Sequence, residues 1–420
     1  MLDLVLKNVQ LPDGSRKDIA VEQGTVKRLG SGGRGDVTID CTSYICVPGA
    51  VDMHVHMRGG QESYKEDWQT GSRSALAGGV TLVVDQPNTL PPITTVERFQ
   101  DRVAEAKQNS YCHFGINAGA TAGADFGKLW SAGPLAFGEI FLAPSTQGNT
   151  ISLGILQATL AAIRPLQALC TLHAEGSPSQ PPQDLREHDR ERSIQKEEQM
   201  VQKICALARG GDHLHFCHLS GPRGIDAVAA ATLEVTPHHL FLSLEDFAPL
   251  DARGKVNPPL RSDAVRRMLW SRWDRIDVLA SDHAPHTLSE KVASFPSAPA
   301  GLPGVETMLP LLLAAVLDKK ITLTSLIEKT SLSPSRILGI TPPGFVPGSR
   351  ADFALYPREK TLISADMLHS RCGWTPYEGR EAVFPDYVFM DGTCAYAEGD
   401  FSERRGRWYG GRGYKEMDPI

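Results

Sequence analysis

Short apolar runs recur along the middle of the chain, with segments of helical composition and spacing between them. The runs are Ile45–Val55, Gly79–Asp85, Tyr111–Ala118, Phe137–Leu142, Ala168–His173, Leu214–Leu219, Leu233–Pro237 and Ile276–Asp282. The helical segments include Val96–Gln108 and Gln195–Ala208. Near-continuous apolar runs are typical of strands buried on both faces of a parallel sheet. Eight strand–helix units in about 300 residues predict an α/β fold with a (β/α)8 TIM-type barrel over residues 48–345.

Both ends of the chain alternate in short β-like pieces separated by turns rich in Gly and Asp. The pieces are Leu4–Val9, Asp18–Glu22, Thr25–Leu29 and Val37–Ile39 at one end, and Ala351–Tyr356, Tyr387–Met390 and Ala395–Ala397 at the other. We expect residues 1–47 and 346–420 to form one small β-sandwich domain from both termini.

Composition narrows the function classes. The 420-residue chain has a net charge of -6 and no run of Lys or Arg, so nucleic acid is not an expected partner. Its eight cysteines are scattered and fall mostly in apolar runs, as reduced core residues do. The start of the chain does not resemble a signal peptide, and Met308–Leu317 is too short to span a membrane. We expect a cytoplasmic enzyme with a small-molecule substrate.

Polar residues gather where the predicted strands end, which is where barrel enzymes carry their chemistry. His54 and His56 face the same side of an extended strand, because alternate residues do. A lone histidine at a strand end is more often a hydrogen-bonded residue than a metal ligand. Four histidines and two carboxylates at five strand ends instead predict a metal site: His54, His56, Glu139, His173, His218 and Asp282.

The ligand type indicates the metal. Imidazole and carboxylate without convergent thiolates suit zinc or a similar divalent ion. Six ligands exceed the three that one catalytic zinc uses, so we expect two Zn²⁺ ions per chain. A bimetal site can hold a bridging hydroxide and polarise a carbonyl. Asp282 can both contact a metal and accept the proton of an attacking water.

Motifs extend over nearly the whole chain. They are HxHxR at His54–Arg58, QPNT at Gln86–Thr89, HAE at His173–Glu175, CH at Cys217–His218, TPHHL at Thr236–Leu240, NPPLR at Asn257–Arg261, SDHAPH at Ser281–His286, GLPGVETMLPLLL at Gly301–Leu313 and WTPYEG at Trp374–Gly379. Together they resemble the dihydroorotases of the amidohydrolase superfamily. The resemblance implies a metal-dependent (β/α)8 barrel that reversibly cyclises N-carbamoyl-L-aspartate to L-dihydroorotate in pyrimidine synthesis.

The resemblance also implies roles for individual residues. His54 and His56 would bind the more buried metal, and His173 and His218 the more exposed one. Asp282 would be a metal ligand and the general acid/base. Arg58 and Asn88 would hold the substrate α-carboxylate, which suits the two-pronged donor geometry of arginine. Asn257, His286 and the backbone near Ala300 and Gly301 would complete the substrate pocket.

Two positions depart from the family pattern. Gly59-Gly60-Gln61 stands where Glu-Pro-Gly commonly follows HxHxR, which changes the stiffness of the loop beside Arg58. Glu139 stands where the family has a lysine carboxylated by carbon dioxide that bridges the metals. A glutamate carboxyl is three bonds closer to the backbone, a shortfall of roughly 3.5–4 Å. Glu139 can bridge metals that lie nearer the strand, reach one metal only, or leave a gap that water fills; an ion pair in a dead site is the remaining alternative.

Other functions stay open from the sequence alone. Dihydropyrimidinases and allantoinases share much of the pattern, but their substrates lack the carboxylate that Arg58 would bind. A catalytically silent dihydroorotase-like subunit that binds aspartate transcarbamoylase is the alternative from another class; we also expect a homo-oligomer. Ser289–Pro303 has the composition of a long functional loop, which we expect to close over bound substrate.

Overall fold

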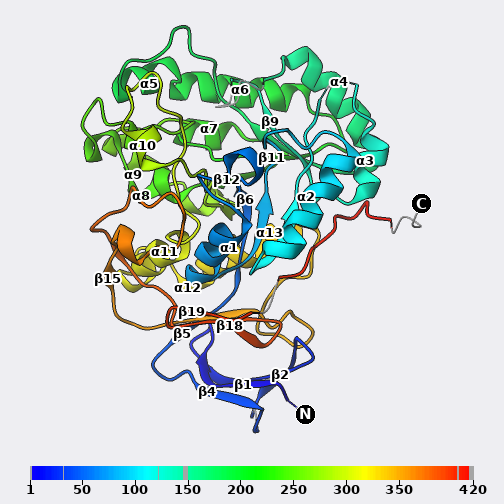
Figure 1. Ribbon diagram of the computed structural model, residues 1–420, viewed down its shortest axis with the longest axis vertical. Helices are drawn as coiled ribbons and strands as arrows, with labels where there is room; N and C mark the ends of the chain where they lie inside the picture. Colours follow the sequence, from blue (N-terminus) through cyan, green and yellow to red (C-terminus); the bar gives the residue numbers. More distant parts are fainter. Residues whose placement is uncertain (1, 32, 122, 145–149, 404–405, 416–420) are drawn as a thin grey trace.

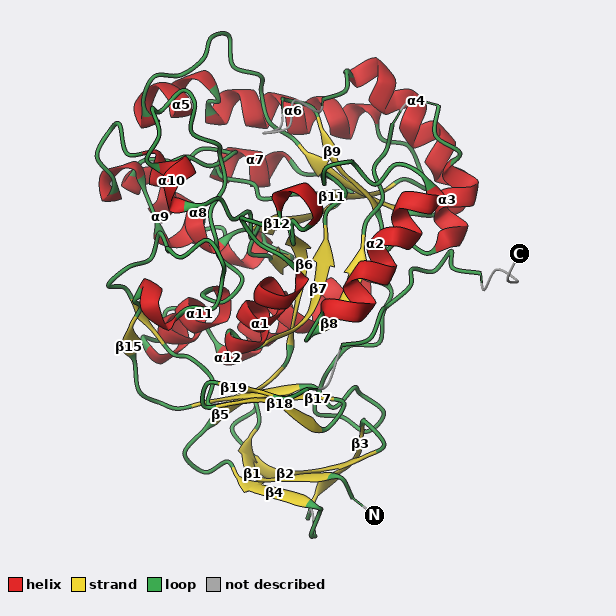
Figure 2. Cartoon of the chain, in the orientation of Figure 1, coloured by secondary structure: helices red, strands yellow, loops and turns green. Residues whose placement is uncertain are grey.

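The computed structural model describes residues 2–31, 33–121, 123–144, 150–403 and 406–415. It confirms the predicted α/β fold (Figures 1 and 2). Parallel strands with surrounding helices make up the larger part of the molecule, and antiparallel sheets lie at the end that holds the N-terminus. None of the described helices combines the length and apolar character needed to cross a membrane.

Each of the predicted apolar runs overlaps a parallel strand. These strands are β6 (Ala50–Val55), β7 (Val80–Asp85), β8 (His113–Ile116), β9 (Phe137–Phe141), β10 (Leu169–His173), β11 (His213–Phe216), β12 (Thr232–Val235) and β13 (Val278–Leu279). Hydrogen bonds join them in the orders β6-β7-β8 and β9-β10-β11-β12-β13. Parallel bridges between Ala118 and Phe137, and between Val55 and His283, connect the two sheets at both edges.

Helices follow most of these strands and cover their outer side. They are α1 (Trp68–Ala77), α2 (Val96–Asn109), α3 (Phe126–Ala132), α4 (Leu153–Ile163), α5 (Leu185–Glu191), α6 (Ile194–Leu207), α7 (Pro222–Ala227), α8 (Pro237–Phe241), α9 (Asp263–Trp270), α10 (Leu288–Lys291), α11 (Met308–Leu317), α12 (Leu323–Ile327) and α13 (Ser333–Leu338). Side chains cap the N-termini of several of these helices. Asp67 accepts hydrogen bonds from the first turn of α1, and Thr95 and Ser193 do so for α2 and α6.

Two further sheets, antiparallel except for the parallel pair β1 and β4, come from both ends of the chain. One has the order β3-β2-β1-β4, from β1 (Leu4–Gln10), β2 (Arg16–Glu22), β3 (Thr25–Gly30) and β4 (Val37–Asp40). The other has the order β19-β18-β17-β14-β5, from β5 (Ile45–Pro48), β14 (Phe353–Tyr356), β17 (Tyr387–Met390), β18 (Thr393–Ala397) and β19 (Asp400–Phe401). A small hairpin pairs β15 (Thr361–Leu362) with β16 (Glu381–Ala382). Buried apolar residues of both larger sheets form one core, among them Leu6, Ile19, Phe353 and Phe389.

The predicted run Ile45–Val55 divides at Gly49. Strand β5 pairs antiparallel with β14 in the terminal sheet, and β6 continues beside β7. A Cβ at Gly49 would lie 2.3 Å from Thr81 Oγ1, so only glycine allows the chain to pass between the sheets there.

Two parts of the predicted terminal domain pack elsewhere. Residues 406–415 follow β8, where the Phe114 N–H donates to Arg407 O and the Tyr409 N–H donates to Phe114 O. Trp374 and Tyr377 share a core with Leu242 and Leu260 from the loops after β12. Both segments bring large aromatic side chains onto the helical part of the molecule, where they find more apolar surface to cover.

Candidate functional site

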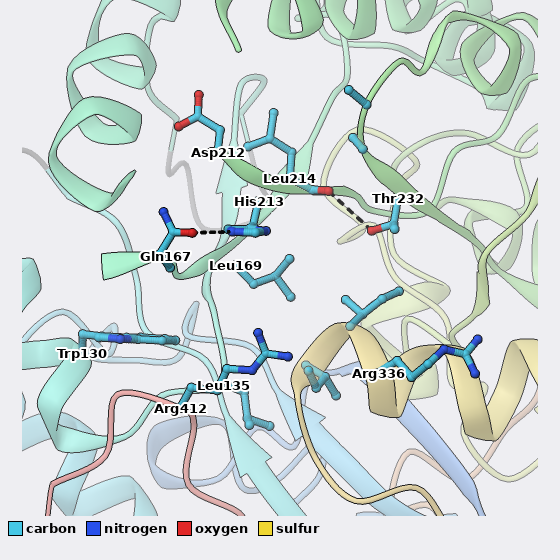
Figure 3. Close-up of a pocket in the computed structure, with 14 residues that line it drawn as sticks. Trp130, Leu135, Gln167, Leu169, Asp212, His213, Leu214, Thr232, Arg336 and Arg412 are labelled. Atoms are coloured by element: carbon cyan, nitrogen blue, oxygen red, sulfur yellow. Dashed lines mark hydrogen bonds between the residues drawn. The ribbon is translucent and has the colours of Figure 1, made fainter. Parts of the chain in front are cut away.

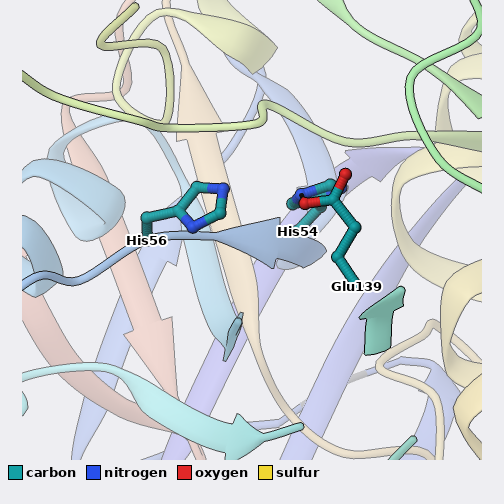
Figure 4. Close-up of side chains that lie close together, drawn as sticks. All are labelled: His54, His56 and Glu139. Carbon is teal, nitrogen blue, oxygen red and sulfur yellow. Dashed lines mark ion pairs between the residues drawn. The ribbon is translucent and has the colours of Figure 1, made fainter. Parts of the chain in front are cut away.

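The six predicted metal ligands lie together at the carboxyl ends of the parallel strands, and all are buried. Five of them form two triads that share Glu139, with His54 and His56 on one side and His173 and His218 on the other. Within each triad the possible ligand atoms lie within 4.8 Å of one another. Figure 4 shows the Glu139 carboxylate beside the His54 ring, with His56 further along the same segment.

Together with Asp282, the first triad has distances between possible ligand atoms that are close to those around a bound ion. His54 Nε2 is 3.4 Å from Glu139 Oε2 and 3.6 Å from Asp282 Oδ1. His56 Nε2 is 3.1 Å from Asp282 Oδ1. Tetrahedral zinc with bonds of about 2.0–2.2 Å separates neighbouring ligand atoms by roughly 3.3–3.6 Å. His54 Nε2 is also buried without a hydrogen-bond partner in the described chain, as expected of an atom that faces a cation.

The second triad is held by hydrogen bonds. Glu139 Oε1 is 2.8 Å from His173 Nδ1 and 2.6 Å from His218 Nε2. These distances are shorter than those between ligands of one ion, so the imidazoles donate directly to the carboxylate in this arrangement. One glutamate carboxylate therefore reaches both pairs of histidines.

In three of the histidines, the ring nitrogen that does not contact Glu139 or Asp282 has an acceptor of its own. His54 Nδ1 donates to Glu234 at 2.6 Å, and His56 Nδ1 donates to the Asn88 carbonyl at 2.8 Å. His173 Nε2 lies 3.0 Å from Glu175 Oε2. These contacts fix which ring nitrogen faces the possible metal. The sequence pattern did not single out Glu234 or Glu175 for this role, although Glu234 is a carboxylate inside an apolar strand.

A cysteine also comes close, contrary to the expectation that no thiol converges on the site. Cys217 groups with His54 and Glu234 on the outer side of the first triad. Burial, with the nearby Glu234 carboxylate, raises the pKa of the Cys217 thiol far above its ordinary value. In the absence of a metal, Cys217 is therefore a neutral thiol.

The charges at the site favour a cation. Burial would raise the pKa of Glu139, but His54 and His218 hold it well below its ordinary value. Burial would lower the pKa of His54, yet Glu234 and Glu139 raise it well above that of free histidine. For His173, the hydrogen bonds with Glu139 and Glu175 outweigh burial and raise the pKa to about 9. The carboxylates thus remain ionised and favour protonation of the imidazoles. A divalent ion can replace these protons and bind the same nitrogen atoms.

The predicted substrate residues line the same pocket as the metal ligands. Its wall includes Arg58, Asn88, Asn257, Ala300 and Gly301, together with His56, Glu139, His173, His218 and Asp282. The sequence did not single out three further residues of the wall: Phe141, Val256 and Ala284. His286 lies behind the wall, with Nε2 3.4 Å from an Arg58 nitrogen and 3.2 Å from Ala300 O.

Arg58 remains inside the pocket despite the changed loop after it. Its side chain is buried, and its Nε donates to Pro285 O at 3.3 Å. The backbone has positive φ at Arg58, His218 and Asp282, at 46°, 36° and 45°. Such conformations are unfavourable for residues with a Cβ and tend to persist at functional sites.

The loop predicted over Ser289–Pro303 packs against this pocket and begins inside the one-turn helix α10. The Gly301 N–H donates to Lys255 O, and Gly301 O accepts from Lys291 Nζ. The Gly301 N–H is therefore engaged within the protein, and its carbonyl oxygen keeps one lone pair free of the Lys291 bond. Movement of the loop on substrate binding stays a prediction.

Another cavity, of about 490 Å³, lies at the opposite ends of the strands. Figure 3 shows His213, at the start of β11, hydrogen-bonded to Gln167, with Arg412 directed toward the cavity and Asp212 directed away. It contains none of the His/carboxylate triads found in the described residues. The chemistry therefore belongs to the pocket at the carboxyl ends.

The chain is similar to archaeal proteins named dihydroorotase. It is 38% identical to that of Methanosarcina acetivorans, over 97% of this chain and 95% of the relative. It is also 38% identical to that of Halobacterium salinarum, over 94% of this chain and 97% of the relative. No family model matches the chain.

Solved structures of cyclic amidohydrolases have the same fold. L-Hydantoinase (dihydropyrimidinase) from Arthrobacter aurescens superposes with a TM-score of 0.90 at 25% identity, over 97% of this chain and 99% of that one. D-Hydantoinase (dihydropyrimidinase) from Thermus sp. gives a TM-score of 0.85 at 23% identity, over 97% and 98% of the two chains.

Proposed function

The chain belongs to the dihydroorotase family of metal-dependent cyclic amidohydrolases, and from this premise we propose that it reversibly cyclises N-carbamoyl-L-aspartate to L-dihydroorotate. The observation that carries the proposal is a buried arginine, Arg58, in the pocket of the His/carboxylate triads. Carbamoyl-aspartate and dihydroorotate both carry a carboxylate that a guanidinium can bind, whereas the hydantoin ring carries none.

We propose that the parallel strands form a closed (β/α)8 barrel over residues 48–345. The bridges at both edges of the two parallel sheets support closure. The terminal sheets would form the small β-sandwich domain, from residues 1–47 and 346–420 without the segments that pack on the barrel. Residues 1, 32, 404, 405 and 416–420 of that domain lie outside the described residues. A homo-oligomer and an aspartate transcarbamoylase partner stay predictions.

We propose two Zn²⁺ ions per chain. His54, His56 and Asp282 would hold one ion, His173 and His218 the other, and Glu139 both. The unpartnered His54 Nε2 and the imidazole–carboxylate donor set fit zinc. Bound there, the ions would polarise the reacting carbonyl and lower the pKa of water.

The side chains of this site would then perform the proton transfers. Arg58, with Asn88, would hold the α-carboxylate and set the ring against the triads. In ring opening, Asp282 would accept a proton from the attacking water and return it to the amide nitrogen as the C–N bond breaks. In cyclisation, Asp282 would take the proton from the carbamoyl nitrogen and return it to the departing hydroxide, which leaves as water. Burial keeps bulk water from competing.

The function is tested with purified protein whose metal content has been measured. Conversion of carbamoyl-aspartate to dihydroorotate, and of dihydroorotate back, is expected, with hydantoin as the comparison substrate. Faster turnover of hydantoin, or no cyclisation by fully metal-loaded protein, would contradict the proposal.

Arg58→Met is expected to raise KM for carbamoyl-aspartate by roughly 10- to 100-fold, because a charge-assisted pair contributes about 1.5–3 kcal/mol. Arg58→Lys is the matched control, since it keeps the charge but loses the two-pronged geometry, and its KM should lie in between. A change in KM below about twofold in Arg58→Met would remove Arg58 from carboxylate binding.

Metal-stripped protein is expected to regain full activity when zinc is restored in bicarbonate-free buffer. A glutamate needs no carbon dioxide to become a metal ligand, unlike a carboxylated lysine. The rates with and without added bicarbonate should agree. Activity that returns only with bicarbonate would show that a carboxylated lysine elsewhere supplies the bridge.

A further inference from the structure

Two buried lysines hold the loop that forms one wall of the pocket. Lys291 is 1% exposed, and its Nζ donates to Lys255 O, Pro299 O and Gly301 O at 2.9, 3.0 and 3.1 Å. Lys255 is 8% exposed, and its Nζ donates to Phe295 O and Ala298 O, each at 2.7 Å. Both side chains thus bond to main-chain carbonyls within a few residues of Ala300 and Gly301.

The bonding pattern favours the charged form of Lys291. Three carbonyl oxygens surround its nitrogen, and a carbonyl can only accept. An ammonium has three N–H donors, whereas a neutral amine has two and would direct its lone pair at the third carbonyl. The Lys291 and Lys255 nitrogens also lie 5.8 and 4.8 Å from the ring centres of Trp374 and Phe295, positions that favour a cation.

Carboxylates do not pair with these cations in the part of the chain that the structure describes. The acidic groups that act on Lys291 are Asp251 and Glu290. Asp251 pairs with Arg253 at 2.7 Å, and Glu290 lies 3.3 Å from Lys65 Nζ. Burial, and then Lys255, lowers the pKa of Lys291 well below its ordinary value, which is the cost of two buried like charges.

We infer that Lys255 and Lys291 are a pair of uncompensated buried cations that positions the Ala300–Gly301 wall and makes the pocket selective for the more negatively charged partner of the reaction. This inference rests on the proposed function. Carbamoyl-aspartate carries two carboxylates and dihydroorotate one, because ring opening creates a carboxylate. A fixed positive charge in the wall therefore attracts carbamoyl-aspartate about twice as strongly, in free energy, as dihydroorotate.

The test is the Lys291→Gln variant, assayed in both directions. Removal of one charge is expected to raise KM for dihydroorotate about threefold and KM for carbamoyl-aspartate about tenfold, because Coulomb energy is linear in ligand charge. The overall equilibrium cannot change, so kcat for cyclisation must rise relative to kcat for ring opening by the same ratio. Lys255→Gln provides the same test if Lys291→Gln does not fold.

Lys329→Gln is the matched control. Lys329 is also a buried lysine, bonded to the main-chain carbonyl of Ile276 at the start of β13, the end opposite Asp282. The Lys329→Gln variant should have a lower melting temperature than the wild type but the same KM for both substrates. An equal rise of both KM values in the pocket variants, or no rise, would overturn the inference. Wild-type protein that converts neither substrate would instead refute the proposed function.

Discussion

Replacing Asp282 with asparagine is expected to lower kcat by at least about 100-fold, the scale of a lost general acid–base catalyst. Asparagine keeps the size of the side chain but cannot accept the proton. Asp282 Oδ1 lies 3.1 Å from His56 Nε2 and 3.6 Å from His54 Nε2. Burial would raise the pKa of Asp282, but these imidazoles hold it far below its ordinary value, so the carboxylate is ionised at neutral pH, as the proposed base must be.

Metal content distinguishes the two proposed roles of Asp282, as metal ligand and as base. The asparagine carbonyl can still contact a metal, so a variant that keeps its zinc but loses turnover has lost the base. Asp277→Asn is the matched control, because Asp277 lies at the other end of the same strand and accepts from the Leu233 N–H. Its kcat should stay within about twofold of wild type. Near-normal turnover of Asp282→Asn would remove Asp282 from the mechanism.

The sequence could predict the residues that face the pocket because their positions follow from strand geometry. His54, His173 and Asp282 each lie at or just after the end of an apolar run, and parallel strands bring such ends to one edge. The period of two along a strand then sets His54 and His56 on one side. The terminal strands could be predicted for the same reason, since alternation and turn residues mark them.

The partners of these residues could not be predicted, because they depend on how distant segments align. Glu234 bonds to His54 across 180 residues, and only the register of the strands brings them together. Lys291 lies in the predicted loop Ser289–Pro303, and the sequence shows the composition of this loop but not the conformation that brings Lys291 to its carbonyl partners. The aromatic residues Trp374 and Trp408 pack against the part of the chain that holds the parallel strands, because tertiary packing, not local pattern, decides where an apolar side chain is buried.

The structure shows that the Glu139 carboxylate, although on a shorter side chain than a carboxylated lysine, contacts both pairs of histidines. Its shorter side chain would fall roughly 3.5–4 Å short of a carboxylated lysine if the ligands were fixed. In the structure, Oε1 lies against His173 and His218, and Oε2 lies 3.4 Å from His54 Nε2. The histidines therefore lie close to strand β9, where a glutamate can contact both groups. The reach that a direct bridge needs is therefore present, and metal analysis of Glu139 variants distinguishes a bridge from a single-metal contact or a plain ion pair.

Glu139→Ala is therefore expected to lose bound zinc and activity together, with turnover below about 1% of wild type, because removing a shared ligand costs several kcal/mol. Alanine leaves four buried histidines without the carboxylate that both triads share. Glu139→Gln is the matched control: it keeps the size and one carbonyl oxygen but removes the charge, so zinc should bind more weakly without being lost. Metal analysis of each purified variant, with cyclisation assayed on the same sample, measures both effects. If Glu139→Ala kept its full zinc content and normal turnover, Glu139 would not be a ligand, and another residue would have to join the two metals.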